Sequence, residues 1–291
     1  MKVSWFEFLA RGYRATHPLP LYDERHIADL EEGEPLDVFI PLIEKDIPLL
    51  HHCIPALHAF LHHPIGEICI ISPKNAQLVS VAKDLGIVFI DENELLPDLR
   101  RDDVQFYTKS GENRRGWIIQ QLLKLAADEL TSKKHYFVID ADTILTRKQN
   151  FTPNGKTVFL QNDAIRKEYF YVNKRVFGFG TQNYWSFVSH QMLFKSDWLA
   201  DMKRHIENRK SEKWYHALIH NLERTKGVGM SEYELYGNWC LNQYPDEVLC
   251  VDWENFKSTR GYIEDSIQNE GDYRSVSRHS YFDPTFVENN Q

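Results

Sequence analysis

From residue 36 onward, short continuous hydrophobic runs alternate with longer stretches in which hydrophobic residues have helical spacing. The runs at 37–42, 67–72 and 87–91 are rich in β-branched and aromatic residues, which predicts buried strands. Residues 46–62 and 75–85 lie between these runs and are predicted to be helices. This order is typical of a β-α-β-α-β unit, in which helices cover a parallel sheet.

The second half of the chain continues with the same kinds of element in a less regular order. An amphipathic helix is expected at 116–130 and a buried strand at 135–139. Further strands are expected at 157–160 and 188–194, and a further helix at 212–224. The chain is therefore expected to be an α/β protein.

Composition excludes several classes of partner. The chain has 291 residues, of which 42% are hydrophobic and 26% charged, as in ordinary soluble proteins. Its formal charge of −8 argues against a nucleic-acid partner, which would require a basic surface. There is no apolar run of about 18 residues, so we expect no transmembrane span. The four cysteines form no CxxC pair, which favours free thiols and a cytoplasmic location.

Residues 1–35 are expected to form an N-terminal extension. Val3, Phe6, Leu9 and Tyr13 have the spacing of one helical face. We expect this face to dock on the rest of the protein. The alternative is a weak peripheral contact with the inner face of the membrane.

Two acids follow the predicted strand at 135–139 directly, namely Asp140 and Asp142. Side chains at positions i and i+2 of an extended segment point the same way, so both carboxylates can face one cleft. Ligands of open α/β sheets bind at the carboxyl ends of the strands. Two carboxylates at this place suit Mg²⁺ or Mn²⁺ that also holds substrate phosphates, whereas the alternative is a turn with solvated acids.

The predicted helix at 116–130 has a polar side as well as a buried one. Trp117, Gln121 and Lys124 lie on the polar side, and Arg114 immediately precedes the helix. Since this helix comes just before the strand that ends at Asp140, it is expected to form a wall of the cleft. Arg114 and Lys124 are then candidates for phosphate contacts.

A second acidic site follows a glycine-rich stretch at 227–229. Ser231 and Glu234 have the spacing of a capping box, in which Glu234 bonds back to the start of the helix. Glu232 has no such task in the sequence pattern, and the helix dipole favours its ionised form. We therefore favour Glu232 as a catalytic acid or base, with Glu234 as the alternative.

The segment from Tyr169 to Phe187 is unusually aromatic and contains Gly178 and Gly180. Aromatic side chains pack well on the apolar faces of sugar rings, so one interpretation is a platform for an acceptor sugar. The other is a second small hydrophobic core, and the sequence does not choose between them.

Four motifs in this order carry a resemblance to GT-A-fold glycosyltransferases, and most closely to a group of small bacterial glycosyltransferase-like proteins. They are residues 116–125, 140–142, 186–192 and 231–237. The resemblance implies a GT-A-like, Rossmann-type mixed sheet that is mostly parallel and flanked by helices. It implies one catalytic domain at 36–285, with a nucleotide-binding half (36–142) and an acceptor-binding half (143–285), followed by a tail at 286–291.

The resemblance also implies a nucleotide-sugar donor, a UDP-sugar being favoured, held by Mn²⁺ or Mg²⁺. In such proteins the first acid of the pair lies toward the ribose or sugar, the second binds the metal, and a late histidine completes the metal shell. The metal ligands expected on this basis are Asp140, Asp142 and His279. The donor contacts expected are Pro41, Arg114, Trp117, Gln121, Lys124 and Asp140, and the acceptor contacts are Trp185 and His190.

The function expected from these features is metal-dependent transfer of a sugar to a hydroxyl group of a glycan or glycolipid, in bacterial surface glycan synthesis. One alternative is a nucleotidyltransferase that acts on a sugar phosphate. That class normally has a basic, glycine-rich loop after the first strand, and residues 43–46 do not resemble one. The other alternative is a non-catalytic carbohydrate-binding protein with the same fold.

Overall fold

The computed structural model describes residues 5–20, 22–27, 30–181, 183–224, 227–257 and 273–277. Its main sheet has five strands in the order β3-β2-β1-β4-β7. Their bounds are Leu36–Pro41 (β1), Ile65–Ser72 (β2), Val88–Asp91 (β3), His135–Ile139 (β4) and Gln191–Lys195 (β7). Strands β1 to β4 are parallel and β7 is antiparallel to β4, which confirms the predicted mixed, mostly parallel sheet.

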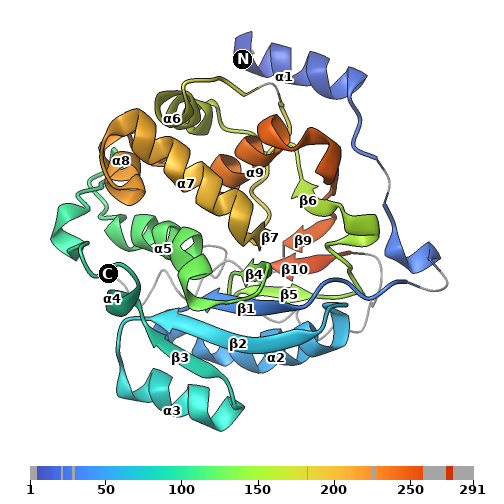
Figure 1. The fold of residues 1–291 in the computed structure, drawn as a ribbon, viewed down its shortest axis with the longest axis vertical. Coiled ribbons are helices and arrows are strands. Elements are labelled where there is room, and N and C mark those ends of the chain that lie inside the picture. The colour runs from blue at the N-terminus through green and yellow to red at the C-terminus, as the bar shows by residue number, and fades with distance from the viewer. Residues whose placement is uncertain are drawn as a thin grey trace.

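The first half is the predicted β-α-β-α-β unit. Helices α2 (Ile47–Phe60) and α3 (Ala76–Leu85) connect its three strands, and α5 (Arg115–Ala126) leads to β4. In Figure 1, α2 and α3 lie on one side of the sheet, while α5 and the later helices lie on the other. Side chains of β1 alternate between the two sides, with Val38 packing among the residues of α2 and Phe39 packing toward α5.

The later helices build the second layer on the α5 side of the sheet (Figure 1). They are α6 (Lys167–Phe177), α7 (Ser196–Lys210), α8 (Trp214–His220) and α9 (Glu232–Gln243). The expected helix at 212–224 is thus present but shorter. The first part of the aromatic segment is the helix α6, with Phe170, Val172 and Val176 buried in the core. A close approach holds the segment after α6 against α9, since a Cβ on Gly237 would lie 2.4 Å from Cγ of Phe187.

Two small sheets complete the described fold. Strand β6 (Thr157–Gln161) pairs in parallel with β8 (Val248–Asp252). Strand β5 (Thr143–Leu145) begins directly after Asp142 and pairs with β10 (Ser275–Ser277), which also pairs with β9 (Asn255–Lys257). The C-terminal strand β10 therefore lies beside the chain segment that carries the two acids.

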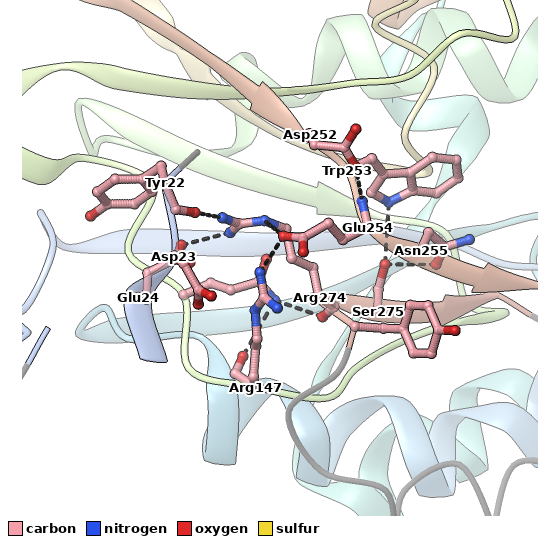
Figure 2. Close-up of polar contacts among 12 residues, drawn as sticks. Tyr22, Asp23, Glu24, Arg147, Asp252, Trp253, Glu254, Asn255, Arg274 and Ser275 are labelled. Atoms are coloured by element: carbon pink, nitrogen blue, oxygen red, sulfur yellow. Dashed lines mark hydrogen bonds and ion pairs between the residues drawn. The ribbon is translucent and has the colours of Figure 1, made fainter. Parts of the chain in front are cut away.

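A buried charge cluster ties the N-terminal segment to this small sheet (Figure 2). The guanidinium of Arg274, fully buried, lies 2.6 Å from Oε1 of Glu24 and also donates to the carbonyl of Tyr22. Glu254 is ion-paired with Arg147 and, more loosely, with Arg274. Because a buried charge without a partner is costly, these pairs fix the position of β10 against residues 22–24.

The N-terminal helix α1 (Trp5–Thr16) docks on its own protein, as the sequence led us to expect. Of the predicted face, Phe6 and Tyr13 contact the ring of Tyr184, whereas Leu9 is exposed and Val3 lies outside the described residues. Between β3 and α5 lie the short helix α4 (Glu92–Leu95), a 3-10 turn at Arg101–Asp103 and an isolated β-bridge between Tyr107 and Asn113. No helix in the part of the chain that is described is long and apolar enough to cross a membrane.

Candidate functional site

The candidate site is a cavity of about 680 Å³ at the carboxyl ends of β1, β2 and β4. Its floor includes Pro41, Ile71 and Asp140, and one wall is the start of α5 with Gly116 and Trp117. Helix α2, which follows β1, and helix α5, which precedes β4, lie on opposite faces of the sheet (Figure 1). A crevice forms at such a switch point, which is where open α/β sheets bind ligands.

Asp140 and Asp142 both line this cavity, as predicted, although residues 140–143 form a turn, closed by a bond from the Thr143 N–H to the Asp140 carbonyl at 2.9 Å, and not the extended segment that was expected. Each oxygen of Asp140 is close to a nitrogen: Oδ1 is 2.5 Å from Nζ of Lys124, and Oδ2 is 2.9 Å from Nδ1 of His190. Burial by itself would raise the pKa of Asp140, but the nearby Lys124 charge and the bond to His190 hold it well below its usual range. Asp140 is therefore ionised and fixed in orientation.

Lys124 lies behind Asp140 and is itself buried. Its ammonium is 2.7 Å from Oε1 of Glu232 and donates to the hydroxyl of Tyr233 at 3.1 Å. Although burial would lower its pKa, the carboxylates of Asp140 and Glu232 raise it well above the usual range. Lys124 is therefore a charged bridge between two carboxylates, and it is absent from the described lining of the cavity, where a phosphate contact was expected.

Glu232 is held in place by α5. It is 3% exposed, its carboxylate pairs with Lys124, and its backbone N–H donates to Oε1 of Gln121 at 3.2 Å. The expectation that Glu232 has no structural partner is thus wrong, because the sequence pattern considered only its own helix. Neither Glu232 nor Gln121 belongs to the described cavity lining.

Glu234 is fully buried and faces away from the helix start. Ser231 accepts a bond from the backbone N–H of Glu234, which confirms half of the predicted capping box. The Glu234 carboxylate does not complete that box but accepts from Ser186 Oγ at 2.7 Å, Phe187 N at 3.1 Å and Asn238 Nδ2 at 2.9 Å. It therefore connects α9 to the segment before β7. Burial outweighs these bonds and raises the pKa of Glu234 to about 7.

This pKa predicts a pH dependence of stability. Between pH 4.5 and about 7 the native Glu234 keeps its proton while the unfolded chain has lost it. The free energy of unfolding should therefore fall as pH rises through this window, by up to about 3 kcal/mol from this group. Urea denaturation at pH 5 and pH 8 should show a smaller pH difference for Glu234→Gln than for the wild type. An equal difference in both proteins would contradict the assignment.

His190 lines the cavity, as expected for a contact with substrate. Its φ of 57° lies in the left-handed region, which is costly for a residue other than glycine. This turn lets the His190 carbonyl accept from the N–H of Asp140 at 2.9 Å while the ring bonds the Asp140 carboxylate. Trp253 packs against the His190 ring at a centroid distance of 5.1 Å.

Trp185 lies elsewhere. Its Nε1–H donates to the carbonyl of His17 at 2.9 Å, and Arg14 lies over its ring at 5.5 Å. Its described contacts thus anchor the end of α1 and do not include the cavity, where an acceptor contact had been expected. The sequence offered no sign of this long-range pairing.

The remaining expected donor contacts do line the cavity. They are Pro41, Arg114 and Trp117, with the Arg114 guanidinium 5.8 Å from the centre of the Trp117 ring. Arg114 also lies 3.5 Å from the carboxylate of Glu112 at the rim.

Asp46 is a further acid of the cavity that sequence reasoning missed, and Glu92 and Glu112 also belong to the lining. Burial raises its pKa, and the charges of Asp142 and Asp140 add to this effect while Lys45 opposes it. Asp46 immediately precedes α2, where an acid is common for structural reasons alone. Its position after the first strand was the signal that could have identified it.

The described residues contain no group of three or more His, Cys, Asp or Glu side chains arranged to hold a metal ion. His279, the expected third ligand, lies outside these residues. Ser277 pairs with Thr143, the residue after Asp142, and their hydroxyl oxygens are 3.0 Å apart. The acids of the cavity suit Mg²⁺ or Mn²⁺, which proteins commonly hold with one or two carboxylates together with phosphate oxygens.

Several solved structures are similar to this chain, all at low identity. Mouse xyloside xylosyltransferase 1 is 12% identical, with 86% of this chain and 99% of that chain covered, at a TM-score of 0.48. The bifunctional glycosyltransferase WbbM is 10% identical, with 85% and 46% covered and a TM-score of 0.47. The galactosyltransferase LgtC is 12% identical, with 84% and 87% covered and a TM-score of 0.43.

No curated protein matches the chain. A family model does match, over residues 47–284, and its description is a family of unknown function (DUF6492). The match covers more than half of the chain, including the acids at the end of β4 and helix α9. The chain therefore belongs to the DUF6492 family, whose function is unknown.

Proposed function

We propose that this protein is a glycosyltransferase that moves a sugar from a nucleotide-sugar donor to a hydroxyl acceptor with the help of a divalent cation. The observation that carries the proposal is the pair Asp140 and Asp142 in a cavity of about 680 Å³ whose lining also includes Lys45, Arg101 and Arg114. The volume lies within the range of about 300–1,000 Å³ that is usual for small-molecule sites.

The charges of the cavity support a nucleoside diphosphate bound through a cation. Asp46, Asp140 and Asp142 would repel a diphosphate that entered by itself. A Mg²⁺ or Mn²⁺ ion held by these acids would remove this repulsion and would supply positive charge against the leaving diphosphate. Arg114 is placed at the same wall, and a guanidinium matches phosphate oxygens with paired donors.

Of the two acids, we assign the direct metal contact primarily to Asp142. Both oxygens of Asp140 lie within 3 Å of the nitrogens of Lys124 and His190. Asp140 is therefore the more constrained acid, suited to orienting the donor as well as to sharing the metal. His279 follows Ser277 by two residues, and Ser277 pairs with the residue after Asp142, which supports His279 as a further ligand.

Glu232 has a positioning role in this proposal. Its carboxylate contacts Lys124, and Lys124 contacts Asp140, so the start of α9 sets the orientation of the first acid. Glu234 holds the segment before β7, which leads to His190. Both acids act on the cavity through other residues.

UDP-sugars are the first donors to test. The proposed acceptor is a glycan or glycolipid, and the proposed process is bacterial surface glycan synthesis. Residues 36–285 would form the catalytic domain, with the donor half ending at Asp142.

Filling the cavity should abolish donor binding without loss of the fold. Gly116 lines the cavity in the first turn of α5, and a Cβ added there meets no atom within 4 Å. Gly116→Leu should therefore place its side chain in the cavity and, since glycine is a poor helix former, keep or raise the melting temperature. Titration of UDP in the presence of Mn²⁺ should show binding by the wild type and none by the variant.

The matched control is Gly12→Leu, because Gly12 also lies in a helix, would have no atom within 4 Å of an added Cβ and is not part of this cavity. It should bind UDP like the wild type. If Gly116→Leu bound UDP as well as the wild type, the larger cavity would not be the donor site.

The function itself is tested by product release. The protein is incubated with nucleotide sugars in the presence and absence of Mn²⁺, and nucleoside diphosphate is measured. Metal-dependent release of the diphosphate is the expected result. Release of pyrophosphate from a nucleoside triphosphate and a sugar phosphate would instead favour nucleotidyl transfer.

A further inference from the structure

A second cavity, of about 320 Å³, lies between the end of α1, the segment after α6 and the end of α9. The three elements approach one another in the upper part of Figure 1. None of the residues described as lining it lines the larger cavity. It is therefore a separate site, and the proposed donor binding makes no use of it.

Aromatic rings and neutral hydrogen-bonding groups make up much of this second cavity. Tyr13 and Phe179 supply the rings, and Thr181, Asn183 and Asn238 supply hydroxyl and amide groups. The lining residues that the structure describes include no Asp, Glu, Lys or Arg. This chemistry selects an uncharged ligand that has both apolar faces and many hydroxyl groups.

Hydrogen bonds within the protein fix the polar side chains that line this second cavity. Asn238 donates from Nδ2 to the carbonyl of Glu234 at 2.7 Å and to its carboxylate at 2.9 Å, and Thr181 donates to Oδ1 of Asn238. Asn183 donates to the carbonyl of Trp185 at 3.0 Å. Both asparagines are at most 5% exposed, so their orientation is set before any ligand enters.

Helix α1 completes the cavity. The rings of Tyr13 and His17 stack at a centroid distance of 4.2 Å, and Tyr13 also contacts the ring of Tyr184. The bond from Trp185 to the His17 carbonyl anchors the end of the helix. The docking of α1 therefore does more than bury hydrophobic surface, since it supplies one wall of a polar and aromatic cavity.

We propose that this second cavity binds a neutral sugar residue of a glycan. The apolar face of a pyranose ring packs on an aromatic ring. Because both N–H groups of Asn238 are donated to Glu234, the sugar hydroxyls would donate to the remaining lone pairs of the oriented asparagine oxygens. The inference rests on the lining of this cavity and does not require the proposed transferase activity. If both proposals hold, the site keeps a glycan on the protein while its end reacts elsewhere.

Gly180 allows a direct test. It lines the second cavity, its φ is not in the left-handed region, and an added Cβ meets no atom within 4 Å. Gly180→Leu should therefore fill the cavity and leave the fold intact. Gly116→Leu, which fills the larger cavity, is the matched control.

Saturation-transfer NMR with the full-length protein is the measurement. The probes are methyl glycosides of glucose, galactose, mannose, N-acetylglucosamine and fucose at millimolar concentration. We expect transfer to at least one glycoside with the wild type and with Gly116→Leu, and loss of that transfer with Gly180→Leu.

Three outcomes would overturn the inference. They are no transfer to any glycoside, transfer that persists in Gly180→Leu, and transfer that Gly116→Leu abolishes. The last would show that the sugar binds in the larger cavity. None of them bears on Mn²⁺-dependent binding of UDP, so the two proposals can fail separately.

Discussion

Asp142→Asn is expected to reduce turnover by about 10³-fold or more and to abolish Mn²⁺-dependent binding of UDP. The substitution keeps the shape of the side chain and removes the charge that we propose holds the cation, which would supply several kcal/mol of stabilisation to the leaving diphosphate. The melting temperature should change little, because Asp142 is only partly buried. Product release and calorimetric titration measure the two effects.

The control for this variant is Asp84→Asn, an exposed acid on α3. It removes the same charge from the molecule but leaves the cavity unchanged, so activity and binding should equal those of the wild type. Wild-type turnover in Asp142→Asn would show that this acid does not hold a catalytic cation.

Lys124→Met is expected to destabilise the protein by about 3–5 kcal/mol and to abolish activity. The ammonium of Lys124 lies 2.5 Å from Asp140 and 2.7 Å from Glu232, and its loss leaves two carboxylates close together with no ammonium between them. Urea denaturation measures the change in free energy of unfolding.

The double variant Lys124→Met/Glu232→Gln should recover part of this loss, because one of the two charges is removed. Lys213→Met is the control: Lys213 pairs with Asp98 at the surface, where both side chains are more than half exposed, and such pairs contribute little. Full stability of Lys124→Met would mean that the buried bridge is not required for folding.

The parts of the fold that rest on local pattern were predictable. The β-branched runs of β1, β2 and β3 and the spacing of α2 and α3 are visible in the sequence, and the sheet follows from them. That Asp140 and Asp142 share a cavity was also predicted, but for the wrong reason, because a turn at residues 140–143 brings them together and not the two-residue period of an extended chain. The sequence analysis did not predict helix α6, because its many aromatic residues obscure the helical spacing of hydrophobic positions.

The contacts within the site depend on tertiary structure, which local pattern does not contain. Lys124 and Glu232 are 108 positions apart and meet only because α9 packs against α5. Asp46 joins the cavity because α2 starts where β1 ends, beside β4. Trp185 is turned toward α1 by a bond to a residue 168 positions away. The contacts of these residues therefore could not be predicted from the sequence, whereas the strands could.

The central claim is that the acids at the end of β4 hold a cation against a diphosphate. A crystal structure grown with Mn²⁺ and UDP, with the anomalous signal of manganese recorded, tests it most directly. The account predicts one manganese peak that contacts the Asp142 carboxylate and the phosphates of UDP. UDP bound in this cavity with no manganese beside Asp142, or bound at another place on the protein, would contradict it.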